Sequence, residues 1–126
     1  MLTIDQINEL EKLIGQLIGL HTELATLSKK SPNDAVNSFK LRFVNEALIK
    51  CNKLLGAEYK PFEDFNQFND DDIPSNSDVT LVLSQYMQSL EKLRSDNVYI
   101  DFGTWYYKTK DKGNKIQTGP PTKLKK

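Results

Sequence analysis

The segment IDQINELEKLIGQLIGLHTELATLS, residues 4–28, decides the fold that this sequence predicts. Its apolar residues recur every three or four positions, which is the spacing of one helix face and of a heptad seam. Thr3 with Gln6 three residues later is typical of a capping box, so we expect the helix to begin at Ile4. The seam and the residues that widen it are Ile4, Ile7, Leu10, Leu13, Ile14, Leu17, Ile18, Leu20, Leu24 and Leu27. An apolar face this wide needs cover on more than one side, which the rest of the chain must supply.

Four residues of this helix are candidates for a subunit interface. Gly15 and Gly19 stand four positions apart, and each costs a helix interior about 1 kcal/mol relative to alanine. The pair indicates either a close helix crossing, including one between subunits, or two tolerated surface glycines. His21, the only histidine, occupies a seam position where one polar residue can set the register. We therefore expect a homo-oligomer whose interface includes Ile14, Gly15, Gly19 and His21.

Two more helices are expected after the first. Ser31 and Pro32, followed by an acid, are typical of a helix start, and this helix would run to about Leu55 with Gly56 just beyond its end. A third helix is expected over residues 79–95 from its apolar stripe. The short first link favours an antiparallel hairpin. The predicted fold class is mainly α, a three-helix antiparallel bundle.

The long connector between the second and third helices combines aromatic and acidic residues. Phe62, Phe65 and Phe68 are spaced by three, which predicts a short helical turn lying on the bundle. The acids at residues 70–72 fail the EF-hand pattern, because a proline follows at the third ligand position and the required glycine is absent. We therefore interpret them as a solvated acidic loop.

Residues 98–118 differ in composition from the predicted helices and indicate a small C-terminal β-hairpin. The run VYIDFGTWYYKT, residues 98–109, is rich in β-branched and aromatic residues and indicates a strand that bends at Gly103. A turn over residues 110–114 would let residues 115–118 return as a second strand. We predict one helical domain over residues 1–118 and a basic, flexible tail over residues 119–126.

The charges balance over the whole chain but not along it. Seventeen Lys and Arg residues match seventeen Asp and Glu residues, so no net charge draws the protein toward nucleic acid or a membrane. Residues 61–100 hold eight acids against two basic residues, whereas residues 101–126 hold seven lysines against two acids. This asymmetry indicates either pairing within the fold or between subunits, or a basic surface that faces a partner.

The composition also bears on location. A single cysteine, Cys51, excludes an internal disulfide and fits a reducing compartment. The opening residues Met1–Asp5 carry no basic residue of a signal peptide, and no run approaches the roughly 20 apolar residues of a membrane span. We expect a cytoplasmic protein without membrane contact.

The sequence shows no pattern of catalytic or cofactor chemistry. A nucleophile needs a base within reach, and His21 in a helical seam is poorly placed to act as one. One histidine and one cysteine cannot form a zinc site, and no glycine-rich phosphate loop is present. We therefore predict no enzyme activity, no cofactor and no metal.

The predicted hairpin has the greatest potential for binding. Its aromatic rings could stack on bases while its lysines contact phosphates. Alternatively, every second aromatic ring faces the core and the lysines line a solvated strand edge. The candidate ligand-binding residues are Trp105, Tyr106, Tyr107, Lys108, Lys110, Lys112 and Lys115.

Two classes of function are compatible with these patterns. The first is a small non-enzymatic protein-interaction module, such as a regulator, inhibitor or assembly factor, that acts by surface complementarity on a protein partner. The second is a protein that binds or sequesters a nucleotide or single-stranded nucleic acid through the aromatic and lysine-rich hairpin. Either class could include a viral or plasmid accessory protein.

Overall fold

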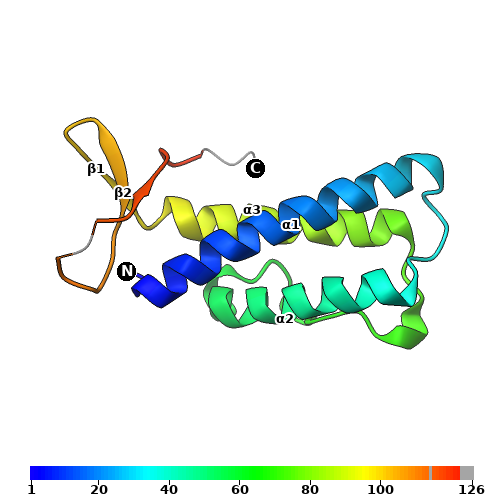
Figure 1. Ribbon diagram of the computed structural model, residues 1–126. Coiled ribbons are helices and arrows are strands. Elements are labelled where there is room, and N and C mark those ends of the chain that lie inside the picture. Colours follow the sequence, from blue (N-terminus) through cyan, green and yellow to red (C-terminus); the bar gives the residue numbers. More distant parts are fainter. Residues whose placement is uncertain (114, 123–126) are drawn as a thin grey trace.

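The computed structural model describes residues 1–113 and 115–122, with only the backbone at residue 70. Three helices, α1 (Ile4–Lys30), α2 (Ser38–Tyr59) and α3 (Asn76–Ser95), form the body of the molecule (Figure 1). A 3-10 helix, η1 (Asp70–Asp72), precedes α3, and the strands β1 (Val98–Asp101), β2 (Thr104–Tyr107) and β3 (Gln117–Thr118) follow it. The strands pair antiparallel in the order β1-β2-β3. The predicted mainly α fold with a small C-terminal β element is confirmed.

The lengths of the connections set the directions of the helices. α1 runs opposite to both α2 and α3, whereas α2 and α3 run parallel, because residues 60–75 return along α2 before α3 begins (Figure 1). Two asparagines hold this connector in place. The Asn52 side chain donates to the Asn66 carbonyl, and the Asn45 side chain bonds both the N–H and the C=O of Phe68. The antiparallel arrangement therefore applies to α1 with each of its neighbours.

The core is built on the apolar face of α1. The seam predicted for residues 4–28 is the face that the other helices cover, and complete burial of a large aliphatic side chain stabilises a fold by about 1.5–3 kcal/mol. The side chains with no exposed surface include Ile7, Leu10, Leu13, Leu17 and Leu24 of α1, Val44, Leu48 and Cys51 of α2, and Val79, Leu83, Tyr86 and Leu90 of α3.

α2 begins at Ser38, later than the predicted start at Pro32. Asn37 caps it, with the side chain accepting a hydrogen bond from the third residue of the helix. The carbonyls of Pro32 and Asp34 instead accept hydrogen bonds from the first N–H groups of α3. The predicted start was wrong because these tertiary hydrogen bonds hold residues 32–35 in a turn. Gly56, with φ +64°, interrupts the helix where its end was predicted, and one further turn follows.

The three connector phenylalanines form an aromatic cluster instead of the predicted helical turn. The ring centroids of Phe65 and Phe68 lie 5.0 Å apart, those of Phe62 and Phe65 lie 5.9 Å apart, and Tyr86 of α3 stands 6.3 Å from Phe62. The prediction was wrong because side chains of α2 bond the connector backbone and hold it out of a helix. The turn of 3-10 helix forms later, at residues 70–72.

Cys51 should be unreactive in the folded protein. Its side chain is fully buried in the core, and burial raises the pKa of the thiol to about 12, so the reactive thiolate is scarce at neutral pH. We expect a thiol reagent such as Ellman's reagent to modify native protein only as fast as the chain opens, and denatured protein at once. Rapid, complete modification under native conditions would contradict the burial of this residue.

Candidate functional site

The sheet is fixed to the bundle at its base, where β2 passes the start of α1 (Figure 1). Tyr107 is buried, and its hydroxyl donates a 2.7 Å hydrogen bond to Glu11 Oε1. Burial, followed by this bond, raises the pKa of Tyr107 above its ordinary range, so the phenol keeps its proton. The N–H of Ile4 donates to Asp111 Oδ2 at 2.7 Å. The base of the sheet is therefore tied to α1 by contacts far apart in sequence.

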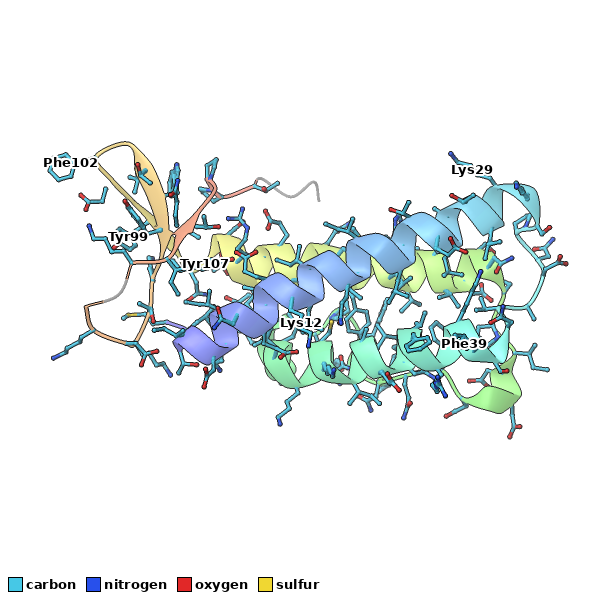
Figure 2. The ribbon with its side chains drawn as sticks, viewed as in Figure 1. Lys12, Lys29, Phe39, Tyr99, Phe102 and Tyr107 are labelled. Atoms are coloured by element: carbon cyan, nitrogen blue, oxygen red, sulfur yellow. The ribbon has the colours of Figure 1, made fainter. Side chains whose placement is uncertain are left out.

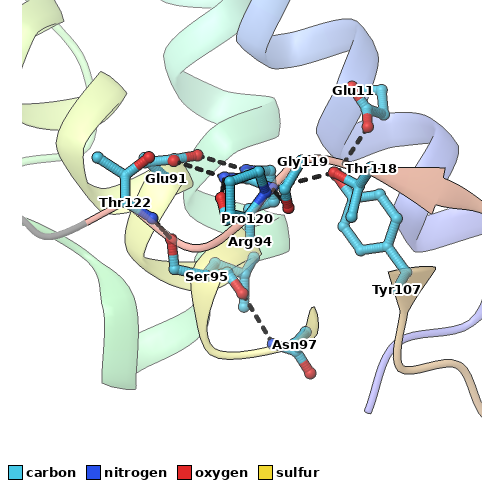
Figure 3. A network of polar contacts seen from close by, with 11 residues as sticks. Glu11, Glu91, Arg94, Ser95, Asn97, Tyr107, Thr118, Gly119, Pro120 and Thr122 are labelled. Atoms are coloured by element: carbon cyan, nitrogen blue, oxygen red, sulfur yellow. Dashed lines mark hydrogen bonds and ion pairs between the residues drawn. The ribbon is translucent and has the colours of Figure 1, made fainter. Parts of the chain in front are cut away.

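Arg94 of α3 forms the second attachment of the sheet (Figure 3). Its guanidinium makes a bidentate ion pair with Glu91, at 2.6 and 2.8 Å. It also donates to Thr118 Oγ1 at 3.0 Å and to the carbonyls of Gly119 and Pro120 at 3.0 and 2.8 Å. The hydrogen bonds from Arg94 lower the pKa of Glu91 below its ordinary value. Residues 118–120 are thereby bound to α3, while residues 123–126 of the predicted tail lie outside the described residues.

The three aromatic residues predicted to bind a ligand do not share one face of the sheet. Successive side chains of a strand point to opposite faces. Tyr107 and Trp105 lie on the face that packs against the core, the first buried and the second partly buried, whereas Tyr106 lies on the other face. The three rings therefore form no continuous platform for stacked bases.

The outer face brings together two of the predicted ligand residues, Tyr106 and Lys115. The ring of Tyr106 pairs with that of Tyr99 across the strands, with centroids 5.9 Å apart, and Lys115 Nζ lies 5.1 Å from its centroid. Lys115 also forms a 2.7 Å ion pair with Asp101. This ion pair neutralises the cation nearest to the aromatic face and reduces its attraction for phosphate.

The other predicted lysines follow β2. Lys108 and Lys110 are exposed, and the N–H of Lys110 donates to the Leu2 carbonyl at 2.8 Å. Lys112 lines an open cleft beside Asp5 at the start of α1. The basic groups of residues 108–115 are therefore distributed between the outer face of the sheet and the N-terminal end of the bundle.

The tip of the β1–β2 hairpin is the most exposed apolar feature of the molecule that the structure describes. Figure 2 shows Phe102 at the far end of the hairpin, directed away from the helices. Its exposed fraction is 102%, and Ile100, on the preceding strand, is also exposed. Phe102 and Gly103 have φ values of +50° and +79°, so both central residues of this two-residue turn lie in the left-handed region, as a type I′ turn requires.

Two features of Phe102 make the free energy of folding less favourable. A bulky residue with positive φ is an outlier, and such backbone strain costs about 1–3 kcal/mol. The hydrated ring also forgoes the roughly 1.5–3 kcal/mol that burial of a phenylalanine would supply. Asn-Gly is the sequence that this turn prefers. The residue at this position therefore does not serve the isolated fold.

Residues 98–109 fold as two strands, with Asp101 opposite Thr104, so the prediction of one strand bent at Gly103 is wrong and the tip was not among the predicted site residues. The sequence does contain a signal for this turn. Residues 102–103 form a two-residue spacer that ends in glycine and separates two runs of β-forming residues, which is the pattern of a tight hairpin.

The candidate interface residues of α1 are divided between its solvent side and the edge of the core. Gly15 and Gly19 are exposed, and a methyl group added to either would meet nothing within 4 Å. No helix of the described chain therefore crosses at these glycines. Ile14 and His21 are partly buried beside the core residues Leu17 and Leu24. Contact with a second subunit at this surface stays a prediction.

No family model, curated protein or solved structure matches this chain. Among the described side chains, which exclude those of residues 70, 114 and 123–126, no group of three or more His, Cys, Asp or Glu is arranged to hold a metal ion. No helix in the described residues is long and apolar enough to cross a membrane. The geometry of the hairpin is therefore the feature of this molecule that bears most on its function.

Proposed function

We propose that this protein is a protein-interaction module that binds its partner with the hairpin tip, residues 100–103. Phe102 would enter an apolar pocket of the partner protein, and Ile100 would pack against its rim. The observation that supports this is the complete exposure of a phenylalanine held at positive φ. Aromatic residues that fill pockets commonly dominate the energy of protein interfaces.

The attachment of the hairpin suits this role. Binding is stronger when the contact element is already held in its bound conformation, because less freedom is lost on association. Here Tyr107 ties β2 to Glu11 of α1, and Arg94 ties the end of β3 to α3. The tip thus projects from a strand pair that is fixed at its base to two helices.

A protein partner fits the tip better than nucleic acid does. Single-stranded nucleic acid is held by several aromatic faces along a continuous basic groove. In this sheet the rings of residues 105–107 alternate between faces, and Lys115 is neutralised by Asp101. The tip itself presents the apolar side chains of Ile100 and Phe102, and the nearby Lys115 is paired with Asp101, which favours an apolar pocket.

Phe102→Asn should stabilise the fold while it weakens binding. Asparagine tolerates positive φ and prefers this turn, so the free energy of unfolding should rise by about 1 kcal/mol, as measured by urea denaturation. The partner would lose the aromatic anchor, a change that commonly costs about 2 kcal/mol or more of binding. A mutation that merely damaged the fold would lower both the free energy of unfolding and the affinity for the partner.

Binding can be measured with a photoreactive phenylalanine analogue at position 102 and, as a control, at exposed Leu81 on α3. In extracts of the source organism, we expect a discrete crosslinked protein from position 102. Unlabelled wild-type protein should suppress this product, and the Phe102→Asn protein should not. Equal competition by both proteins, or the same product from position 81, would contradict the proposal.

A further inference from the structure

A second exposed apolar surface lies on α2, at the end of the bundle far from the hairpin (Figure 2). Phe39 and Phe43 are exposed, and their rings pack edge to face with centroids 4.9 Å apart. The guanidinium carbon of Arg42 lies 5.4 and 5.0 Å from the two centroids. We call these three residues the aromatic–arginine face. An open cleft of about 600 Å³ adjoins it, with Ile49 of α2 and Gln67 of the connector on its walls.

Arg42 lacks an anionic partner within the described part of the chain. No hydrogen bond or ion pair within those residues involves its guanidinium, which lies over the two rings. Other basic residues nearby are paired: Lys40, two positions earlier, bonds Glu23 at 2.7 Å. A guanidinium stacked on aromatic rings keeps its hydrogen-bond donors at the rim, where they fit a carboxylate in two-pronged geometry. The face therefore suits a ligand that joins a carboxylate to an apolar side chain.

The segment Asp71–Ile73 combines a carboxylate with an exposed apolar side chain. Ile73 is 67% exposed and has φ +43°, which is unfavourable for a β-branched residue. Asp71 and Asp72 are exposed beside it. The segment lies next to the N-terminal end of α2, because the Pro74 carbonyl accepts a 3.0 Å hydrogen bond from the N–H of Val36.

We propose that two copies of this chain associate face to face, with Asp71–Ile73 of each seated on the aromatic–arginine face of the other. In a two-fold dimer each contact occurs twice, so a surface that carries an acid and a cation side by side complements itself. Asp71 would bind the partner copy's guanidinium, and Ile73 would cover the exposed phenylalanine rings. The dimer buries the unpaired cation and the strained isoleucine in one interface. It does not depend on the hairpin function.

Charge exchange tests this dimer directly. Sedimentation velocity over a concentration series should show that wild-type protein dimerises. Arg42→Glu, and separately the double variant Asp71→Arg with Asp72→Arg, should each weaken self-association by roughly 10-fold or more, because like charges then face each other. An equimolar mixture of the two variants should recover the dimer, since every facing pair is again opposite in charge.

Lys53→Glu is the matched control, because it makes the same charge change at an exposed position of α2 outside the proposed interface. It should leave the dimer intact. Circular dichroism should show native helix content in every variant. A wild-type protein that stays monomeric at all concentrations, or variants whose mixture fails to associate, would overturn the proposal. Dimers that resist both charge reversals but dissociate with a bulky residue at Gly19 would also overturn it and place the interface on α1.

Discussion

Leu17→Ala should lower the free energy of unfolding by about 3–4 kcal/mol, whereas Ile18→Ala, one residue later, should change it by less than about 1 kcal/mol. Leu17 has an exposed fraction of 0% at the centre of the core, so truncation removes buried methyl groups and leaves a cavity between the helices. Ile18 is 49% exposed on the solvent side of the same helix. Alanine has the higher helix propensity, which offsets part of the lost contact at that site.

Urea denaturation monitored by far-ultraviolet circular dichroism measures both values in one series. The two variants share a helix turn and a similar loss of volume, and leucine and isoleucine differ in helix propensity by only about a few tenths of a kcal/mol. The difference between the two losses therefore reports mainly burial. Similar losses from both variants would mean that α1 is covered on both sides, as in an oligomer that uses the surface around Gly15 and Gly19.

The apolar periodicity of residues 4–28 predicted the helix and the side of it that is buried. The reason is that burial of large aliphatic side chains outweighs most other local preferences. The register was less certain: Leu13 is fully buried, while Ile14 and His21, both assigned to the seam, are only partly buried. A straight helix of 3.6 residues per turn drifts relative to a heptad seam, so a seam drawn from sequence drifts off the buried face.

The sequence signals for the start of the second helix failed because residues far along the chain form hydrogen bonds with the same backbone carbonyls. Ser31 and Pro32 resemble a helix start, but the side chain of Asn76 donates to the Ser31 carbonyl at 2.9 Å, and the Pro32 carbonyl accepts from the first turn of α3. Asn76 lies far along the chain, and no short window of sequence contains both partners. Helix ends that depend on such tertiary hydrogen bonds are therefore beyond local pattern analysis.

At the candidate site, local sequence likewise indicates the secondary structure, whereas the burial of each ring depends on residues far away in the chain. The aromatic and β-branched composition of residues 98–109 predicted β structure, although as one bent strand instead of two, and it could not show which rings would be covered. Tyr107 is buried because Glu11 and the start of α1 receive it, whereas Phe102 stays exposed because the turn carries it beyond the helices. Exposure at the tip is thus a property of the assembled fold.

Arg94→Met should release the end of β3 from α3 and lower the free energy of unfolding by about 2–3 kcal/mol. The side chain of Arg94 is only 11% exposed, and methionine would keep most of its apolar stem. The loss therefore comes from the hydrogen bonds that Arg94 donates to Glu91, Thr118 and the carbonyls of the next two residues. Without Arg94, these acceptor groups would need hydrogen bonds from water instead. Lys92→Met is the control, because its ion pair with Asp96 is on the surface and should contribute less than about 1 kcal/mol.

Hydrogen exchange should locate this loss in the sheet. The N–H of Tyr107 donates to the Ile116 carbonyl at 3.0 Å, so its protection should fall in the Arg94→Met protein while that of the α1 core amides falls less. Binding through Phe102 should weaken as well, although the tip is unchanged, because a looser hairpin loses more freedom on association. Unaltered protection at Tyr107 would show that the sheet is held without Arg94.

Acid should reduce the difference between the wild-type and Arg94→Met proteins, because only the Glu91 partner of Arg94 titrates. Arg94 holds the pKa of Glu91 below the unfolded value of 4.5, so the ion pair stabilises the fold fully above that pH. As the pH falls through the lower folded pKa, Glu91 gains a proton and this stabilisation is lost. The unfolding free energies of the two proteins should therefore draw closer below about pH 4.5, while the contacts of Arg94 with residues 118–120 maintain the remaining difference. A difference that stayed constant into acid would assign the effect to the carbonyl contacts of residues 119–120, which do not titrate.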